Sequence, residues 1–400
     1  MTESNLPLAG LRVLDIATFV AAPFAAATLS EFGAEVIKIE QPGEGDSLRR
    51  LGTQSKAGDT YWWLSDARNK KCITLDLRTP KGVEVFQKLV ATADVVAENF
   101  RPGTLEKWGI GPEVLQAINP KLIVLRISAY GQTGPKANLP GFARIAHAFC
   151  GLTHLVGEAD GPPLIPGSTS LGDYLTGIYG AFGVMLALRS REKTGKGQVV
   201  DLGLYEPMFR FLDELAPTYG ATGLVRNRAG AEAPGAAPHS HYPTRDDKWV
   251  AIACSNDRMF QRLVEVMGKP ELAQRPEYAT GFERIKHRET LNALVSAWSG
   301  GLTQAEVLDL CSAGEVPCGP VNDIADIFAD EQFATRENLL TLEHPIAGKI
   351  TIPNVLPRLS NTPGRINHLG AALGEHNQQV YSELGLSSEE QEQLAKEKVI

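Results

Sequence analysis

Short apolar runs alternate with longer amphipathic stretches through the first half of the chain. The runs predict β-strands at residues 11–16, 34–39, 72–77, 95–98, 122–127 and 198–202. Helices are expected between them, for example at residues 23–32 and from Thr79, which caps a helix that begins with Pro80. Repeated β-α-β units predict an α/β fold, with a parallel sheet covered by helices on both faces. In such folds, ligands bind beyond the carboxyl ends of the strands.

The pattern changes in the middle of the chain. Residues 220–243 are rich in Gly, Ala and Pro, which is typical of a linker or a mobile loop. A strand at 249–254 and a helix at 259–267 then open a smaller α+β domain. The predicted segments are 1–220 for the first part of a large domain, 221–324 for the linker and small domain, and 325–400 for the return to the large domain.

Charge and cysteine content restrict the possible partners and the cellular location. The formal net charge of -8 argues against nucleic acid and anionic membranes, so a phosphate-bearing ligand needs locally clustered Lys and Arg. The 5 cysteines are scattered without a C-x-x-C pair, which indicates free thiols. The first residues lack a secretory signal, and no apolar run is both long and free of glycine. We expect a cytoplasmic protein without a membrane span.

A dinucleotide site is disfavoured by the turn after the first predicted strand. Glu40 ends the second strand, where an acid could bind a ribose. The turn at residues 17–23 has no glycine, however, so the close backbone approach to a pyrophosphate is missing. This absence argues against a nicotinamide-dependent dehydrogenase.

Asp173 is the most suggestive candidate for chemistry. It follows Gly172 at the mouth of a predicted helix, where unpaired backbone N–H groups and the helix dipole favour an ionised carboxylate. An ordinary N-cap aspartate is the alternative interpretation. Gly172 would let a substrate carbonyl approach closely. Gly177, Gly180 and Gly183 recur within the helix, which indicates tight packing against another backbone more than a phosphate loop.

The turn at residues 98–104 is a candidate phosphate site, because it joins a strand end to a helix N-terminus and has Arg101 and Lys107 nearby. An ordinary βα loop with Pro and Gly is equally compatible with this stretch. Other basic residues occupy comparable positions, and we expect most of them to be solvent-exposed. They are Arg49, Lys70, Lys71 and Arg78. His239 and His241 lack an evident third metal ligand, so no metal site is predicted.

Several short sequence segments, taken together and in order, resemble those of the class III CoA-transferases, such as formyl-CoA:oxalate and carnitine CoA-transferases. They lie at residues 13–15, 33–40, 42–46, 69–71, 75–77, 98–103, 172–173, 193–198 and 316–320. The likeness covers essentially the whole chain. It implies a large Rossmann-like domain built from both chain ends, a small domain between them and an interlocked homodimer. It further implies that no cofactor is permanently bound and that a CoA thioester is a substrate.

The resemblance also implies roles for individual residues. Asp173 would be the catalytic nucleophile. The CoA-contacting positions fall on Val20, Ala21, Gln41, Leu75, Arg78, Asn99, Phe100, Arg101 and Lys107. Gln41 stands where a relative has an adenine-contacting arginine, and Val20 where a glutamine approaches the acyl group. Both contacts therefore differ from the family pattern.

A carboxylate nucleophile suits exchange between acids, because its acyl anhydride is about as activated as a thioester. Backbone N–H groups around Gly172 and at the helix start would donate hydrogen bonds to the developing oxyanion. A 2-methylacyl-CoA racemase of the same fold is one alternative, but its histidine falls at Phe142, which has no proton to exchange. A non-catalytic CoA-binding protein is another, although the acid at residue 173 is present.

The sequence indicates the identity of the two exchanged acids less specifically than the type of reaction. Residues 140–147 and the lack of a glycine-rich covering loop resemble enzymes that use succinyl-CoA and a short dicarboxylic acid, such as itaconate, mesaconate, malate, citramalate or hydroxymethylglutarate. We expect Arg228, His239 and His241, within the mobile segment 226–245, to bind the second carboxylate. Solvated members of a linker are the alternative.

Overall fold

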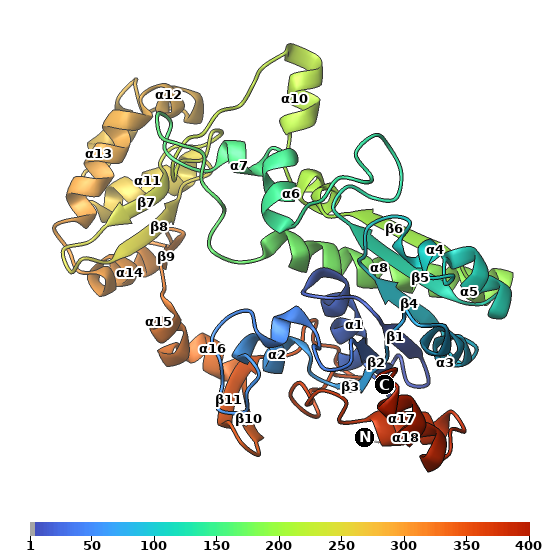
Figure 1. Cartoon of the computed structure of the whole chain (residues 1–400). Helices are drawn as coiled ribbons and strands as arrows, with labels where there is room; N and C mark the ends of the chain where they lie inside the picture. Colours follow the sequence, from blue (N-terminus) through green and yellow to red (C-terminus); the bar gives the residue numbers. More distant parts are fainter. Residues whose placement is uncertain (1–4) are drawn as a thin grey trace. The chain divides into compact units, whose positions relative to one another are not determined.

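The computed structural model describes residues 5–400, which divide into two compact units (Figure 1). Unit 1 comprises the chain up to Thr153, then Ile165–Thr222 and Ala334–Ile400. Unit 2 comprises His154–Leu164 and Gly223–Phe333. The chain thus leaves unit 1 twice, whereas we predicted one excursion at residues 221–324. The additional segment 154–164 contains no strand and only the end of a short helix, so no periodicity marks it in the sequence.

The sheet of unit 1 has the order β3-β2-β1-β4-β5-β6, and all neighbouring strands are parallel. Its strands are β1 (Arg12–Asp15), β2 (Glu35–Glu40), β3 (Lys70–Thr74), β4 (Val95–Glu98), β5 (Ile123–Ser128) and β6 (Val199–Gly203). The predicted parallel α/β sheet is therefore confirmed. β3 begins two residues before its predicted start, because Lys70 is a buried strand residue and not part of an exposed loop.

Helices cover both faces of this sheet, as predicted. On one face α1 (Ala21–Glu31) and α8 (Leu171–Thr194) pack against the strands in one hydrophobic core. On the other face α3 (Pro80–Val90), α5 (Pro112–Ile118) and α17 (Asn377–Glu383) form a second core. The Thr79 hydroxyl accepts a hydrogen bond from Gly82 N, which confirms the predicted helix cap.

The glycines of α8 allow close packing inside unit 1. A side chain at Gly177 would lie 2.7 Å from the carbonyl oxygen of Ala21 in α1, and one at Gly183 would lie 2.8 Å from Val200 in β6. The expected tight packing is confirmed. α8 also has the length and apolar composition of a membrane span. Core helices share that composition, and α8 packs on α1, β5 and β6.

The C-terminal segment covers the edge of the sheet formed by β3. Backbone N–H groups of β3 donate to its side chains, from Cys72 N to His376 Nδ1 at 3.2 Å and from Thr74 N to Asn377 Oδ1 at 2.8 Å. An uncovered edge strand would offer these groups to another chain. The end of the chain is therefore an integral part of unit 1.

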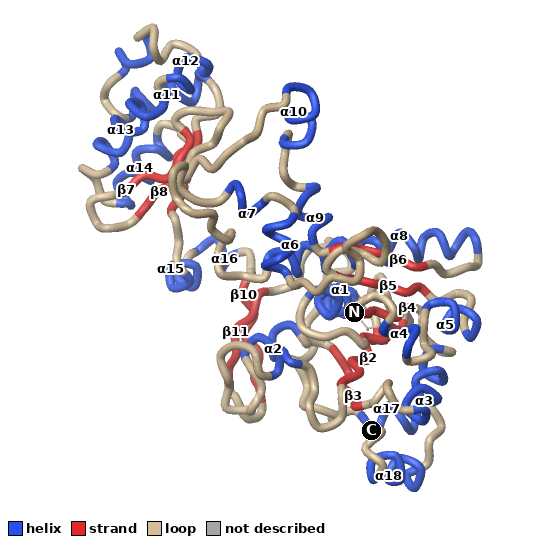
Figure 2. Tube along the Cα trace, turned by 45° about the horizontal axis from the view of Figure 1, so that its top comes forward, coloured by secondary structure: helices blue, strands red, loops and turns tan. Residues whose placement is uncertain are grey.

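The remaining elements of unit 1 are shorter. A hairpin of β10 (Leu339–His344) and β11 (Gly348–Pro353) stands apart from the main sheet (Figure 2). The others are η2 (Ser47–Arg49), α2 (Tyr61–Asp66), α4 (Thr104–Lys107), α6 (Ala143–Phe149), α9 (Tyr205–Arg210), α10 (Leu215–Thr222) and α18 (Ser388–Lys396). The predicted helix at 205–215 ends early at Arg210, and α10 begins only at Leu215.

Unit 2 has its own antiparallel sheet in the order β7-β8-β9 and its own core. Its elements are β7 (His239–Pro243), β8 (Trp249–Ala253), β9 (Cys318–Pro320), α11 (Asp257–Val266), η3 (Pro270–Gln274), α12 (Gly281–Lys286), α13 (Arg288–Ser299), α14 (Gln304–Ala313) and α15 (Ile324–Ala329). Two more helices span the boundaries between the units, α7 (Leu152–Leu155) and α16 (Glu331–Thr335).

The expectation that residues 220–243 form only a linker is wrong at its end. His239–Pro243 is strand β7, and Tyr242 within it is 1% exposed and donates to Asn292 Oδ1 at 2.6 Å. This strand was not predicted because it has five residues and only one buried side chain, which gives no recognisable alternation of apolar and polar positions.

A buried ionic network lies beneath the first loop of unit 1. The ammonium group of Lys38 in β2 is 2.9 Å from Asp46 Oδ2 and 3.6 Å from Asp15 Oδ1, and it also donates to the carbonyl of Ala17. Lys70 in β3 is 2.9 Å from Asp15 Oδ2. Lys38, Lys70, Asp15 and Asp46 are at most 2% exposed. Burial of these charges is tolerable because each is paired and hydrogen-bonded.

A second buried pair adjoins this network. Arg49 binds both carboxylate oxygens of Glu40 at 2.7 Å and stacks 3.7 Å from the ring of Trp63. The expectation that Arg49 and Lys70 are solvent-exposed is therefore wrong. Their carboxylate partners are distant in sequence or on other strands, so the pattern around each basic residue does not reveal burial.

Asp46→Ala should destabilise the protein strongly, because it removes the main partner of a buried ammonium group. The expected loss is about 3 to 5 kcal/mol of unfolding free energy. Urea unfolding followed by tryptophan fluorescence measures it. Arg189→Gln is the control, since Arg189 and Glu192 form an exposed ion pair worth at most about 1 kcal/mol. Equal stability of the two variants would contradict the importance of the network.

Candidate active site

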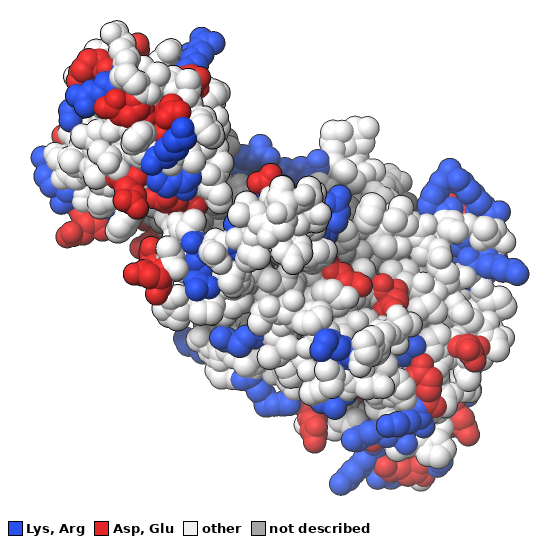
Figure 3. Space-filling model, turned by 90° about the horizontal axis from the view of Figure 1, so that it is seen from above, with Lys and Arg blue, Asp and Glu red and all other residues white. Residues whose placement is uncertain are grey.

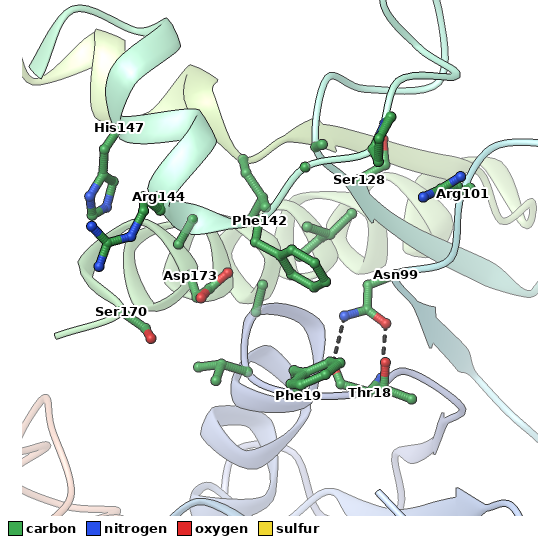
Figure 4. Close-up of a pocket in the computed structure, with 18 of the residues that line it drawn as sticks. Thr18, Phe19, Asn99, Arg101, Ser128, Phe142, Arg144, His147, Ser170 and Asp173 are labelled. Atoms are coloured by element: carbon green, nitrogen blue, oxygen red, sulfur yellow. Dashed lines mark hydrogen bonds between the residues drawn. The ribbon is translucent and has the colours of Figure 1, made fainter. Parts of the chain in front are cut away.

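The main cavity of unit 1 lies beyond the carboxyl ends of β1 and β4, where the strand order reverses (Figure 4). Its volume is about 650 Å³. Residues 18–21 after β1 and residues 99–102 after β4 form one side, while α6 and the segment leading into α8 form another. Open α/β sheets bind ligands at this point of reversal. The structure thus has its main cavity at the edge of the sheet where ligands were expected.

Two hydrogen bonds join the loop after β1 to the loop after β4. Thr18 N donates to Asn99 Oδ1 at 2.8 Å, and Asn99 Nδ2 donates back to the carbonyl of Thr18 at 2.6 Å (Figure 4). The next residue, Phe19, has a φ of 62°, a left-handed conformation that is costly for a bulky side chain. Asp46 Oδ1 accepts from Phe19 N at 3.0 Å and thereby stabilises this conformation. The buried network therefore determines where the cavity wall stands.

Asp173 reaches this cavity from the first turn of α8. The N-cap residue is Ser170, so the interpretation of Asp173 as the N-cap is wrong. Asp173 is half-buried and takes part in no ion pair or hydrogen bond with the residues that the structure describes. Burial raises the pKa of Asp173 to about 6. The carboxylate is thus mostly ionised at neutral pH, yet it is poorly solvated.

Gly172 packs against protein side chains that leave no room for a side chain of its own. A side chain there would lie 2.9 Å from Met208 and 3.0 Å from His147 Nε2, and Gly172 does not line the cavity. Its N–H donates to His147 Nε2 at 3.0 Å. Burial and the charge of Arg144 lower the pKa of His147, which favours the neutral ring that this hydrogen bond requires. Of the N–H groups predicted to donate to an oxyanion, that of Gly172 is therefore already engaged by His147.

A hydrogen-bonded cluster holds the start of α8 from the other side. Trp62 Nε1 donates to Asp66 Oδ2 at 2.9 Å and lies 2.8 Å from the Tyr174 hydroxyl, which itself donates to Asp66 Oδ2 at 2.8 Å. Tyr174 also packs edge-on against Phe24 of α1. The residue after Asp173 is thereby fixed, and with it the direction in which the Asp173 side chain points.

The predicted CoA-contacting residues separate into two neighbouring cavities. Those that line the main cavity are Val20, Ala21, Asn99, Phe100 and Arg101. A smaller cavity of about 110 Å³ is lined by Gln41, Leu75, Arg78 and again Phe100. Phe100 thus borders both cavities. Lys107 is exposed on α4 and lines neither of them.

Arg78 is already paired with a carboxylate. Its Nε and Nη2 donate to Asp76 at 2.8 and 2.9 Å, and the Arg78 hydrogen bonds lower the pKa of Asp76 to about 2. Gln41 Nε2 also donates to Asp76, at 3.2 Å. Because a guanidinium has five N–H donors, Arg78 retains donors for a further ligand at the rim of the small cavity.

The three residues predicted to bind a second carboxylate belong to unit 2, whereas unit 1 alone forms the cavity that contains Asp173. His239 and His241 lie on β7, and Arg228 donates to the carbonyl of His154 at 3.0 Å. No cluster of three or more potential metal ligands occurs within residues 5–400.

Two residues of α6 that line the cavity were not singled out from the sequence. Arg144 and His147 lie three residues apart, hence on one face of the helix. Within the described part of the chain, Arg144 makes no ion pair or hydrogen bond. The only available signal was this spacing in residues 140–147, which also fits an exposed helix surface.

Comparisons with known proteins show the family of the chain. The family model described as CoA-transferase family III matches residues 8–377. The chain is 52% identical, over 100% of its length and 99% of the relative's, to the succinyl-CoA--L-malate CoA-transferase beta subunit of Chloroflexus aurantiacus. It is 42% identical, over 98% of both chains, to the succinyl-CoA--D-citramalate CoA-transferase of the same organism. A crystal structure of a CAIB/BAIF family protein from Brucella suis matches 95% of this chain and 100% of that one, with a TM-score of 0.85 and 35% identity.

Ionisation of Asp173 should oppose folding, because its folded pKa of about 6 exceeds the ordinary value of 3.8. The stability that its neutral form contributes is present below pH 3.8 and is lost as the pH rises through 6. Asp173→Asn should therefore have a higher melting temperature than the wild type at pH 8, equivalent to about 2 to 3 kcal/mol of unfolding free energy. Near pH 4 the two melting temperatures should be equal. Thermal unfolding at several pH values measures this difference. A difference that does not vary with pH would contradict the raised pKa.

Proposed function

Since the chain belongs to CoA-transferase family III, we propose that it transfers CoA from succinyl-CoA to a second short dicarboxylic acid, with Asp173 as the acylated residue. The observation that carries this proposal is the ionisable, unpaired carboxylate of Asp173 in the cavity at the reversal of the strand order. The names of the relatives supply the substrate class, since both act on succinyl-CoA and a short hydroxydicarboxylic acid. L-Malate and D-citramalate are therefore the acceptors to test first.

In the first half-reaction, an Asp173 oxygen attacks the thioester carbonyl and the C–S bond breaks. This step gives a mixed anhydride and CoA thiolate. The thiolate then attacks the aspartyl carbonyl, and the donor acid leaves as a carboxylate that carries one former Asp173 oxygen. The product is an aspartyl-CoA thioester. No external base is required, because both nucleophiles are anions.

The second half-reaction reverses these steps with the acceptor acid. Its carboxylate attacks the aspartyl thioester, thiolate leaves, and the thiolate then attacks the acyl carbonyl of the new anhydride. Asp173 returns as a carboxylate with one oxygen from the acceptor. Each tetrahedral intermediate needs a donor for its oxyanion. Because the Gly172 N–H donates to His147 and the Tyr174 N–H donates to the carbonyl of Ser170, the N–H groups of Leu171 and Asp173 are the backbone candidates in the first turn of α8.

Proton transfer of the racemase type finds little support in this cavity. Phe142, which is 66% exposed and packs edge-on against Phe19, stands at the position where the racemase has its histidine. His147 lines the same cavity, but its Nε2 accepts from Gly172 N. A ring held in this way has no free basic nitrogen on that side, which favours CoA transfer over racemisation.

For the CoA moiety, we assign the phosphates to the side of the cavity that is remote from Asp173. Arg101 lies there beside Asn99 and Ser128 (Figure 4), and it makes no ion pair within residues 5–400. Arg78 lies in the adjoining small cavity. The predicted contact by Lys107 has the weakest support, since this side chain lines neither cavity.

We further propose that unit 1 pairs with a second copy through an apolar stripe on α8. Ile178, Phe182, Met185 and Leu186 are each between 41% and 56% exposed and recur at helical spacing. Exposed apolar areas of this kind mark interfaces. Figure 3 shows broad uncharged areas on the face in view. Because one relative is named as a beta subunit, the competing possibility is pairing with a different chain.

Asp173→Ala should retain the fold and lose CoA exchange by at least about a thousandfold, as expected when a covalent nucleophile is removed. Succinyl-CoA consumption and product acyl-CoA are followed by mass spectrometry with L-malate as the acceptor. Incubation of the wild type with succinyl-CoA and hydroxylamine should also convert Asp173 to its hydroxamate. Exchange at the wild-type rate in the alanine variant would refute the proposal.

A double variant, Ile178→Glu with Phe182→Glu, should be monomeric, because two charges would be buried at the proposed interface. Sedimentation equilibrium should give a dimer for the wild type and for a control variant, and a monomer for the double variant. Phe282→Glu is the matched control, since Phe282 in unit 2 is 68% exposed and lies outside the stripe. A monomeric wild type would contradict self-pairing, and a dimeric double variant would exclude this surface.

A further inference from the structure

Arg144 lies in the cavity wall without a partner. Its guanidinium lines the cavity that contains Asp173, and among the described residues no carboxylate pairs with it and no carbonyl accepts from it. The other arginines at these cavities differ, since Arg78 is bound to Asp76 and Arg101 stands on the remote side. Arg144 is solvent-exposed, so its guanidinium is hydrated in the free protein and its N–H donors remain available to an anion in the cavity.

The helix α6 sets the direction of Arg144. His147 is one turn further along, and its Nε2 is 3.0 Å from the N–H of Gly172, the residue before Asp173. Residues three apart share a helix face, so Arg144 also faces the start of α8. Figure 4 shows its guanidinium on the side of the cavity where Asp173 and Ser170 lie. The charge of Arg144 is close enough to contribute to the lowered pKa of His147.

A gap separates this cation from the nucleophile. No ion pair joins Arg144 to Asp173 within the described residues, and burial alone raises the pKa of Asp173. Arg144 therefore does not serve as the resting counter-ion of Asp173. A carboxylate nucleophile and an unpaired guanidinium that line the same cavity suit a ligand with an electrophilic carbonyl at one end and an anion at the other.

The CoA phosphates do not fit this position. The pantetheine arm separates the thioester of an acyl-CoA from its phosphates. When the thioester carbonyl is at Asp173, the phosphates are consequently remote from it. A cation on the Asp173 side then meets the acyl group itself, and in succinyl-CoA the free end of that group is a carboxylate. The same applies to the distal carboxylate of an incoming dicarboxylic acid.

We propose that Arg144 binds the distal carboxylate of the transferred dicarboxylic acid and so selects dicarboxylates over monocarboxylates. This inference rests on the proposed role of Asp173, because it takes that residue as the site of attack. It replaces Arg228, His239 and His241 as the expected carboxylate ligands with a residue of unit 1. Guanidinium groups bind carboxylates through two parallel hydrogen bonds, so charge and geometry both contribute.

The first test compares two donors of equal acyl length, succinyl-CoA and butyryl-CoA, in release of CoA. Arg144→Gln should lower kcat/KM for succinyl-CoA by roughly 10- to 100-fold, as expected for loss of a charged hydrogen bond, and change the butyryl-CoA value little. Arg144→Lys should be intermediate, because it keeps the charge and loses the fork. Arg101→Gln is the matched control and should weaken both donors equally.

A second readout is independent of turnover. Phenylglyoxal should modify Arg144 in the wild type, and succinate should slow this modification at that peptide while butanoate should not. Equal losses on both donors, or no loss in Arg144→Gln, together with no selective protection, would overturn the inference. Exchange that persists in Asp173→Ala would instead refute the aspartyl mechanism, and selective protection of Arg144 would still establish its role as the dicarboxylate ligand.

Discussion

The ion pair between Lys38 and Asp46 determines the shape of the site. It is buried beneath the first loop of unit 1, and its two residues hold that loop through Ala17 and Phe19. Phe19 is thereby kept in a left-handed conformation that its side chain disfavours. A glycine in this turn would adopt the same backbone without assistance. The chain instead uses paired charges, which place a bulky aromatic side chain in the cavity wall where a dinucleotide fold has a bare backbone.

This apolar wall has a direct electrostatic consequence for Asp173. Removal of water raises the pKa of the carboxyl to about 6, because its charged form loses solvation. The carboxylate is then more basic than an ordinary aspartate and still ionised at neutral pH. Those are the properties that a nucleophile needs for attack on a thioester. The helix N-terminus alone would have lowered the pKa, so burial is the stronger effect at this site.

Much of the fold was predictable because its signal is local. The six strands of the main sheet are short apolar runs, and Thr79 with Pro80 marks a helix start by itself. The role of Lys70 was not predictable, since its partner Asp15 is 55 residues away in the chain. β7 was missed for a different reason, because one buried tyrosine in five residues leaves no periodicity. Within the site, Asp173 could be predicted from its position at a helix start and from the family resemblance. The position of Arg144 in the cavity could not, because it depends on the contact of His147, on the same helix, with Gly172.

The proposed mechanism requires a covalent bond to Asp173, and oxygen transfer tests that bond most directly. In the anhydride sequence, one oxygen of the acceptor carboxylate remains on Asp173 when the acyl group leaves on CoA. Turnover of succinyl-CoA with acceptor acid labelled by ¹⁸O in its carboxylates, followed by mass spectrometry of the peptide that contains Asp173, should show incorporation of ¹⁸O at that residue. Rapid CoA exchange without label in Asp173 would contradict the mechanism.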